Sequence, residues 1–329
     1  MNPFSITRVL SALTRACIMA AAAGSFVTGA HAETVYPKRA ITFVVPYPAG
    51  GATDTLARFI GGKLQESWGQ TVVIQNKPGA SGAIGAQFVS HAAPDGYTVL
   101  VGVTSMIQQP AMMKSLPYDP LKDFVPVIQT ASTSNLLVVP LDSPAKNMKE
   151  FVEIAKSHPG QMNFASWGPG SSAHIHGELL NQQAGLDLTH IPFQGSAPMI
   201  TNLIGGQVSS AFIDIPSAMP QLKSMRPLAV TGPQRIPELP DVPTFTELGY
   251  KSFDPRGWHG LFLPAATSSE IVHKLSAEID RILKLPETEA KIKSLGMIRG
   301  GGTPEQFAAA MRKDSAIYAK IIAAAGIKL

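Results

Sequence analysis

Short apolar strands that alternate with amphipathic helices are the feature that most limits what this chain can fold into. Between residues 40 and 101, three apolar runs alternate with two helical patterns, in the order strand 40–45, helix with Leu56, Phe59, Ile60 and Leu64 on one face, strand 71–74, helix 83–92 and strand 97–101. A β-α-β-α-β rhythm of this kind predicts a mostly parallel sheet with helices on both faces.

A second set of the same kind predicts a second sheet. It comprises helix 148–157, strand 162–165, helix 173–183, strand 188–191, helix 197–204 and strand 208–213. Two extended segments, 124–139 and 258–264, look like crossings between the sets, and helices at 269–283 and 304–324 close the chain, the latter with Thr303 as N-cap. We therefore predict two α/β domains with a ligand cleft between them: domain 1 of residues 33–133 plus 256–329, and domain 2 of residues 134–255.

The N-terminal segment predicts export. Arg8 and Arg15 precede an Ala-rich apolar stretch, and Ala30-His31-Ala32 forms a small-x-small cleavage site, so residues 1–32 read as a signal peptide. No later segment reaches the ~18 to 20 apolar residues of a membrane span. We expect a soluble protein in the periplasm after cleavage near Ala32.

Composition excludes several classes of site. Cys17 is the only cysteine and lies inside the predicted signal, so the mature chain offers no disulfide, thiolate metal site or cysteine nucleophile. Without Arg8 and Arg15 it keeps 25 basic residues against 23 acidic ones, with no long basic run. Such a charge balance does not indicate a nucleic-acid-binding surface.

Three strand-to-helix loops are rich in Gly, Ser or Thr: residues 46–53, 167–172 and 194–196. Ligands of open parallel sheets lie beyond the carboxyl ends of the strands. There, unpaired N–H groups at helix N-termini favour an anion. If the loops converge, they would bind a small carboxylate without any arginine.

Polar and aromatic side chains in these loops have two interpretations each. Asp54, at a helix N-terminus, either caps the helix or pairs with an amino group of a ligand. The aromatic residues Tyr47, Trp167 and Phe193 are either core residues or walls of a small-ligand pocket.

Other chemistries have weaker support. Gly79, Gly82 and Gly85 have the spacing G-x-x-G-x-x-G, which is not that of a dinucleotide fingerprint. No G-x-S-x-G nucleophile elbow is present, and His174 and His176, two apart on a helix, are poorly placed to share a metal. We expect no catalytic activity, cofactor or metal.

Several long motifs in one order resemble the periplasmic receptors of tripartite tricarboxylate transporters, the Bug family. They are YPKRAITFVVPYPAGGATDTLAR, VVIQNKPGASGAIGAQFVSHAAPDGYTVL, GPGSSAHIHGELL, HIPFQGSAPMITNLIGGQV and WHGLFLPAATSSEIVHKL, which together cover most of the mature chain. The resemblance implies a two-domain, type II binding protein of the Venus-flytrap kind, without catalysis, that captures a small di-, tri- or aromatic carboxylate for a membrane transporter.

The same resemblance implies which residues hold the ligand. Backbone amides of the first Gly-Gly loop and of the opposing loop would anchor the carboxylate, with Tyr47, Ala49, Gly50, Gly51 and Thr53 on one side. Opposite them stand Gly168, Gly170, Ser171, Ser172 and His174, with Gly195, Ser196 and Asp214 nearby; Asp54, Thr104, Ser105, Trp167 and Phe193 complete the predicted site.

Three positions depart from the family pattern. Similar receptors often carry an acidic residue at the position of Ile213 and a polar one after it, where this chain has Ile213-Asp214. Trp167 replaces a small residue, and His259 stands where an aromatic residue is common. We expect a monomer that delivers its ligand to transporter subunits. A ligand-sensing receptor and, with Ser172 as nucleophile, a secreted serine hydrolase are the alternatives.

Overall fold

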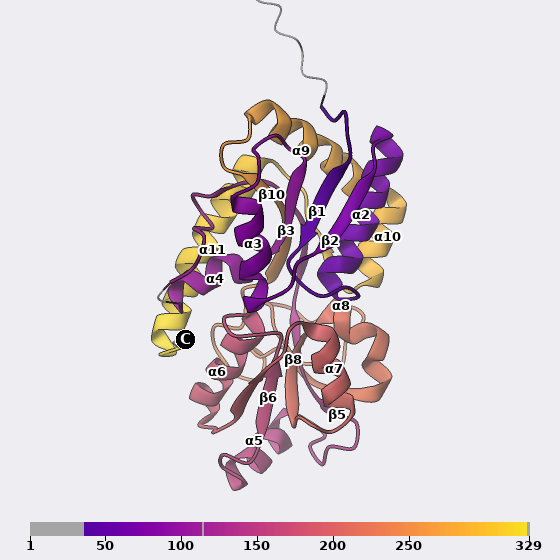
Figure 1. Cartoon of the computed structure of the whole chain (residues 1–329). Helices are drawn as coiled ribbons and strands as arrows, with labels where there is room; N and C mark the ends of the chain where they lie inside the picture. The colour runs from indigo at the N-terminus through magenta and orange to yellow at the C-terminus, as the bar shows by residue number, and fades with distance from the viewer. Residues whose placement is uncertain (1–35, 114, 328–329) are drawn as a thin grey trace, which may run out of the picture. The chain divides into compact units, whose positions relative to one another are not determined.

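The computed structural model describes residues 36–113 and 115–327, and the chain from Pro37 onward forms one compact unit. The predicted signal peptide, residues 1–32, lies outside the described residues. The unit contains two β-sheets flanked by helices, which confirms the predicted α/β architecture (Figure 1). We call each sheet with its helices a lobe.

The first lobe is built on a six-stranded sheet in the order β11-β4-β10-β3-β1-β2. Its strands are β1 (Ile41–Val45), β2 (Val72–Asn76), β3 (Thr98–Val103), β4 (Phe124–Thr133), β10 (Gly257–Pro264) and β11 (Ile298–Arg299). Its helices are α2 (Ala52–Trp68), α3 (Ala83–Ser90), α4 (Ser105–Gln108), α9 (Ser269–Leu283), α10 (Pro286–Ser294) and α11 (Pro304–Ala324).

The second lobe is built on a five-stranded sheet in the order β7-β6-β8-β5-β9. Its strands are β5 (Asn135–Pro140), β6 (Asn163–Ser166), β7 (Thr189–Pro192), β8 (Ser210–Asp214) and β9 (Met225–Val230). Its helices are α5 (Met148–Ser157), α6 (Ser172–Ala184), α7 (Ser196–Ile204) and α8 (Ile215–Ala218).

Both sheets are mixed, where the sequence predicted mostly parallel ones. The strands of the β-α-β units, β1 with β2 and β3, and β6 with β7 and β8, pair in parallel. The strands of the crossing segments, β10 and β5, pair antiparallel with their neighbours. A crossing strand enters its sheet directly from the other lobe, without the intervening helix that a parallel connection needs.

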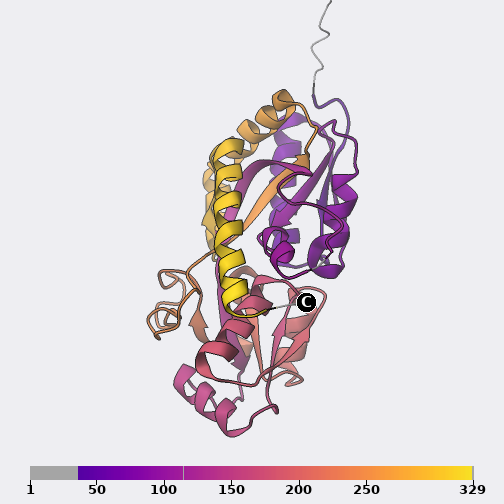
Figure 2. The ribbon, with the colours of Figure 1, turned by 90° about the vertical axis from the view of Figure 1, so that its left-hand side faces the viewer.

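Two kinds of segment connect the lobes. β4 ends at Thr133 and β5 begins at Asn135, so one nearly continuous extended segment passes from the first sheet into the second. Helix α11 lies along the first lobe, begins with a capping box of Thr303 and Gln306, and reaches α6 at its end (Figures 1 and 2). There the side-chain amide of Gln182 donates to the carbonyl oxygen of Ala324 at 3.0 Å.

Candidate functional site

A cavity lies where the carboxyl ends of β1, β3, β6, β7 and β8 meet the beginning of β10. The space in it that is open to the centres of water molecules is about 60 Å³. At roughly 10–15 Å³ for each water, this corresponds to several waters or one small ligand. Its lining residues are Tyr47, Pro48, Gly51, Ala52, Thr53, Val103, Thr104, Ser105, Thr133, Asn135, Trp167, Ser172, Gly195, Ser196, Ala197, Asp214, Gly257, Trp258 and His259.

The first loop presents an uncapped helix N-terminus to this cavity. Helix α2 begins after Gly51, and no side chain caps it. Gly50 adopts φ of 86°, a left-handed conformation that favours glycine and turns the chain into the helix. The first N–H groups of a helix have no partner within the helix, so Ala52 and Thr53 bring free donors to the cavity wall.

Asp54 holds the first loop together from outside the cavity lining. Its Oδ2 accepts hydrogen bonds from the Gly50 N–H and from Arg58 Nε, both at 2.9 Å, and its Oδ1 accepts one from Asn76 Nδ2 at 2.9 Å. Burial opposes ionisation of this carboxyl, but the three hydrogen bonds outweigh it and lower its pKa. Asp54 therefore does not cap α2 as one interpretation expected; it fixes the turn before the helix through the Gly50 N–H.

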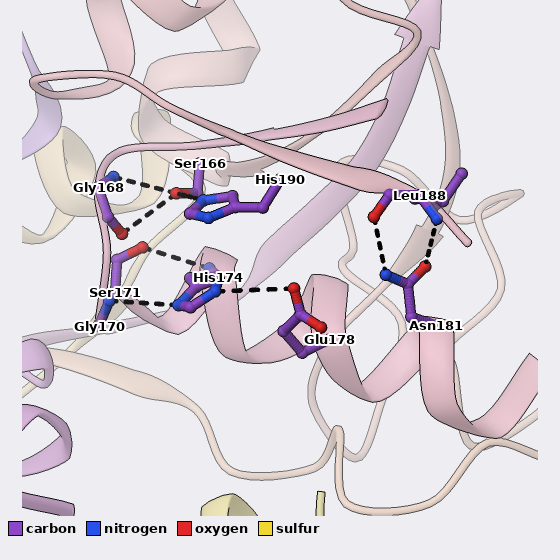
Figure 3. Close-up of polar contacts among 9 residues, drawn as sticks. All are labelled: Ser166, Gly168, Gly170, Ser171, His174, Glu178, Asn181, Leu188 and His190. Atoms are coloured by element: carbon purple, nitrogen blue, oxygen red, sulfur yellow. Dashed lines mark hydrogen bonds and ion pairs between the residues drawn. The ribbon is translucent and has the colours of Figure 1, made fainter. Parts of the chain in front are cut away.

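The second loop uses its donors internally (Figure 3). The Gly168 N–H donates to Ser166 Oγ at 3.0 Å, and the Gly170 N–H donates to His174 Nδ1 at 3.3 Å. Ser171 is the N-cap of its own helix, because its Oγ accepts from the His174 N–H at 3.2 Å. The amides of Gly168, Gly170 and His174 are therefore already bonded, and of the residues predicted in this loop and at the start of α6 only Trp167 and Ser172 line the cavity.

A pair of stacked histidines supports the second loop from behind (Figure 3). The rings of His174 and His190 lie 4.0 Å apart at 18°, and His190 Nε2 lies 2.6 Å from Ser166 Oγ. Burial lowers the pKa of His174 to about 4 and, with the neighbouring His174 adding to it, that of His190 to about 3. Both rings are neutral near pH 7 and act as packing and hydrogen-bonding groups.

The third loop supplies the second uncapped N-terminus. Gly195 precedes α7 with φ of 110°, and no side chain caps this helix. A Cβ on Gly195 would lie 3.0 Å from Cδ of Pro48, so this loop packs closely against the first loop. The N-termini of α2 and α7 therefore reach the same cavity from opposite lobes.

Asp214 and His259 contribute the ionisable groups of the lining. Asp214 accepts hydrogen bonds from Ser196 Oγ at 2.6 Å and from the Ser217 N–H at 3.0 Å. His259 comes from β10 of the other lobe, and its Nδ1 has no hydrogen-bond partner. Burial lowers the pKa of His259 while the charge of Asp214 opposes that shift. Burial also raises the pKa of Tyr47 to about 12, and the charge of Asp214 adds to this shift. Asp214, from the second lobe, therefore acts on two side chains of the first lobe, His259 and Tyr47.

Direct hydrogen bonds cross between the lobes beside the cavity. Ser81 Oγ donates to the carbonyl oxygen of Pro169 at 2.6 Å, and Ser172 Oγ donates to Gln108 Oε1 at 3.0 Å. Ser81 adopts φ of 53°, which is uncommon for a residue other than glycine. Its carbonyl oxygen accepts from Tyr47 OH and Gln109 Nε2, both at 3.1 Å, and these bonds hold the strained turn toward the second lobe.

The structure brings together ten of the predicted site residues in the lining: Tyr47, Gly51, Thr53, Thr104, Ser105, Trp167, Ser172, Gly195, Ser196 and Asp214. Gly168 and Phe193 line an adjoining hollow instead. Ala49, Gly50, Asp54, Gly170, Ser171 and His174 line neither; Ala49 and Gly50 are exposed, and the others make the internal bonds described above.

Sequence reasoning missed part of the wall. Pro48, Ala52, Val103, Thr133, Asn135, Ala197, Gly257, Trp258 and His259 also line the cavity. Thr133 and Asn135 lie within the first predicted crossing, and residues 257–259 lie at the start of the second; both segments were predicted as connections only. Segments that pass between lobes necessarily border the cleft. Their position between the two sets of strands and helices could therefore have identified them as part of the cavity wall.

Two further properties concern the described residues as a whole. Within 36–113 and 115–327, no group of three or more His, Cys, Asp or Glu side chains is gathered as metal ligands would be. No helix in the same ranges combines the length and apolar character of a membrane crossing.

Comparisons with known proteins show which family this chain resembles in sequence and in fold. A family model described as "Tripartite tricarboxylate transporter family receptor" matches residues 56–327. A protein from the tcbD-tcbE intergenic region of Pseudomonas sp. (strain P51) is 37% identical over 90% of this chain and 89% of its own length. A protein of R. palustris, solved with adipate, has 33% identity and a TM-score of 0.86, covering 89% of this chain and 99% of its own. The periplasmic binding protein BugD has 32% identity and a TM-score of 0.85, with the same coverage.

Proposed function

The chain belongs to the receptor family of the tripartite tricarboxylate transporters, and on that premise we propose that it captures a small carboxylate in the periplasm and delivers it to membrane subunits of such a transporter. The ligand is a di- or tricarboxylate or an aromatic carboxylate. Adipate bound to a relative of 33% identity supports this class. The predicted signal at residues 1–32 supports export, and we propose that the protein acts as a monomer.

The observation that carries the proposal is the pair of uncapped helix N-termini that face one cavity. Neither α2 nor α7 has a side-chain cap, and residues at both N-termini line the cavity. Unpaired N–H groups and the helix dipole both favour an anion at such a position, and charge-assisted hydrogen bonds are stronger than neutral ones. We assign the ligand carboxylate to the amides of Ala52, Thr53, Ser196 and Ala197.

Domain closure is the second part of the proposal. We propose that residues 33–133 with 256–329 and residues 134–255 move as two domains about the crossing segments. The anion site is complete only when both helix N-termini approach the ligand, so binding and closure are linked. The close approach of Gly195 to Pro48 and the bond from Ser81 to Pro169 support closure as the binding-competent arrangement.

The aromatic walls set the size and character of the ligand. Tyr47, Trp167 and Trp258 all line the cavity, around a few polar groups. Small-ligand sites combine apolar walls with a few placed polar groups in this way. A flat or extended carbon skeleton between the helix N-termini and the far wall would meet these rings.

The environment of Ser172 argues against the alternative of a serine hydrolase. The hydroxyl of Ser172 donates to Gln108 Oε1 at 3.0 Å, and a side-chain amide cannot act as the general base that a serine nucleophile needs. We therefore propose ligand binding without turnover.

A substitution at Gly51 tests the proposed anion site. Gly51 has φ of −79°, which any residue can adopt, and an added Cβ would meet only the carbonyl oxygen of Pro48 at 3.9 Å. Gly51→Val should therefore fold normally but place its branched side chain at the α2 N-terminus. Calorimetry with adipate, citrate and benzoate should show binding to the wild-type protein. The variant should bind each of these ligands with lower affinity.

Gly62→Val is the matched control, because Gly62 lies in the same helix with nothing within 4 Å of an added Cβ. It should bind like the wild-type protein. No binding of any carboxylate to the wild-type protein would refute the proposed function. Normal binding by Gly51→Val would refute the first loop as the anchor.

A further inference from the structure

The charge of the cavity wall is unusual for a site that receives an anion. Among the lining residues, Asp214 is the only carboxylate, and neither lysine nor arginine occurs. Arg256, next to the lining residue Gly257, is not itself part of the lining. The wall therefore combines donors for one carboxylate with a fixed negative charge that no cation of the lining balances.

Asp214 is held in place by its neighbours. It lies at the end of β8, is 8% exposed, and acts as N-cap of the short helix α8 through the Ser217 N–H. Its other oxygen accepts the Ser196 hydroxyl at 2.6 Å, which fixes the carboxylate beside the N-terminus of α7. Each oxygen of a carboxylate can accept more than one hydrogen bond, so Asp214 retains capacity for a donor from a ligand.

His259 lines the same cavity from the other lobe. Its side chain is 4% exposed, and its Nδ1 lacks a partner. A buried polar atom without a partner costs free energy, and a ligand group that bonds to the ring would recover it. A neutral imidazole offers one donor and one acceptor, and does not supply the positive charge that would balance Asp214.

We propose that Asp214 and His259 select among carboxylates, favouring a ligand whose second polar group is a hydrogen-bond donor, such as a hydroxyl, over one with a second carboxylate. This inference rests on the proposed function, because it assumes that the N–H groups and dipoles of α2 and α7 bind the first carboxylate and offset the charge of Asp214 for that group, whereas a second carboxylate has no helix N-terminus of its own. Among the proposed ligands it ranks hydroxy- or amino-substituted carboxylates ahead of the unsubstituted dicarboxylates.

The physical reason is a mismatch of acceptors. A hydroxyl can donate to Asp214 and accept from the imidazole N–H, so both polar groups of the wall gain a partner. A second carboxylate has acceptors only, and it would bring a like charge toward Asp214 inside a cavity with aromatic walls. Specificity would then arise by rejection of the wrong ligand as well as by attraction of the right one.

Two matched ligand series test the inference by calorimetry. The aliphatic series is hexanoate, omega-hydroxyhexanoate and adipate; the aromatic series is para-methylbenzoate, para-(hydroxymethyl)benzoate and terephthalate. In at least one series, the hydroxy acid should bind the wild-type protein about tenfold or more tighter than the dicarboxylate of the same skeleton, a difference of about 1.4 kcal/mol.

Asp214→Asn removes the charge and keeps the shape. It should improve dicarboxylate binding by about tenfold relative to the hydroxy acid. Asp142→Asn is the control, because Asp142 is an exposed residue of the same lobe and the substitution changes the net charge equally. It should leave the ranking of the ligands unchanged.

His259→Phe provides an independent variant if Asp214→Asn does not fold. It should lose the preference for the hydroxy acid over the methyl compound, yet still reject the dicarboxylate, because Asp214 remains. The inference is overturned if the dicarboxylate binds the wild-type protein as tightly as the hydroxy acid, or if the ranking is the same in Asp214→Asn. Those results would leave the proposed function standing, whereas the absence of binding by any member of either series would overturn both.

Discussion

Ser81 offers the sharpest test of whether closure of the lobes controls binding. Its hydroxyl donates to the Pro169 carbonyl oxygen at 2.6 Å, a bond between a residue of the first lobe and one of the second. Ser81 is absent from the cavity lining, so it has no contact to offer the ligand. Ser81→Ala should therefore weaken binding only by lowering the population of the closed form.

The magnitude follows from the single bond that is lost. A neutral hydrogen bond contributes about 0.5–1.5 kcal/mol net, which corresponds to about a two- to twelvefold lower population of the closed form. Because only the closed form binds, the apparent dissociation constant rises by the same factor when the open form predominates without ligand, and by less when the closed form does. The backbone strain at φ of 53° is the same for Ala and Ser, so it cancels in the comparison.

Calorimetry and stopped-flow tryptophan fluorescence would measure this effect. Every carboxylate that binds should lose affinity by the same factor, mainly through faster dissociation. Ser90→Ala is the matched control, since Ser90 Oγ donates to the Gln87 carbonyl oxygen at 2.9 Å within the first lobe. Unchanged affinity in Ser81→Ala, an equal loss in Ser90→Ala, or a loss for one ligand only would refute closure through this contact.

Three further predictions concern stability. Gly177→Ala should lower the free energy of unfolding in urea by about 1–3 kcal/mol, because its Cβ would lie 2.0 Å from the Phe164 ring. The control is Gly62→Ala, which also adds a Cβ within a helix but has nothing within 4 Å of it, and equal losses in the two variants would contradict the reasoning. Asp54→Ala should lower the free energy of unfolding by about 1–3 kcal/mol, because the Gly50 N–H and the other groups that donate to Asp54 lose their acceptor. Unchanged stability would show that the carboxylate does not hold the loop. Burial lowers the pKa of His174 to about 4 and the pKa of His176 and of His190 to about 3. Their neutral rings stabilise the fold fully above pH 6.5, and this stabilisation falls at lower pH because the unfolded chain binds protons first. Between pH 7 and 5 each histidine should lower the free energy of unfolding in urea by about 2 kcal/mol, and equal stability at both pH values would refute this.

Local patterns in the sequence were sufficient for the framework of the site. The strand β1 is buried except at Thr42, which is half-buried, as its apolar run predicts, and Gly50 permits the turn that starts α2. Thr303 caps α11 as predicted, because capping depends on residues only three positions apart. Both loops with uncapped N-termini, around Gly51 and Gly195, were identified from composition and from their place after a strand.

Only the tertiary structure shows that the second of the three similar loops uses amides internally. Residues 167–172 look as suitable as the other two, but Ser166 and His174 accept from the amides of Gly168 and Gly170, and His190 stacks on His174. His190 is distant in the sequence from the loop that it supports, so no local pattern reveals it.

The sequence by itself determined the alternating elements, the glycine turns and the family motifs, because each depends on residues close together in the chain. Only the tertiary structure decided that Asp214 and His259, from different lobes, border one cavity, and that Ser81 reaches Pro169. These contacts depend on how two separately built sheets pack across the crossing segments. Packing of that kind is set by the whole unit, and no single stretch of sequence encodes it.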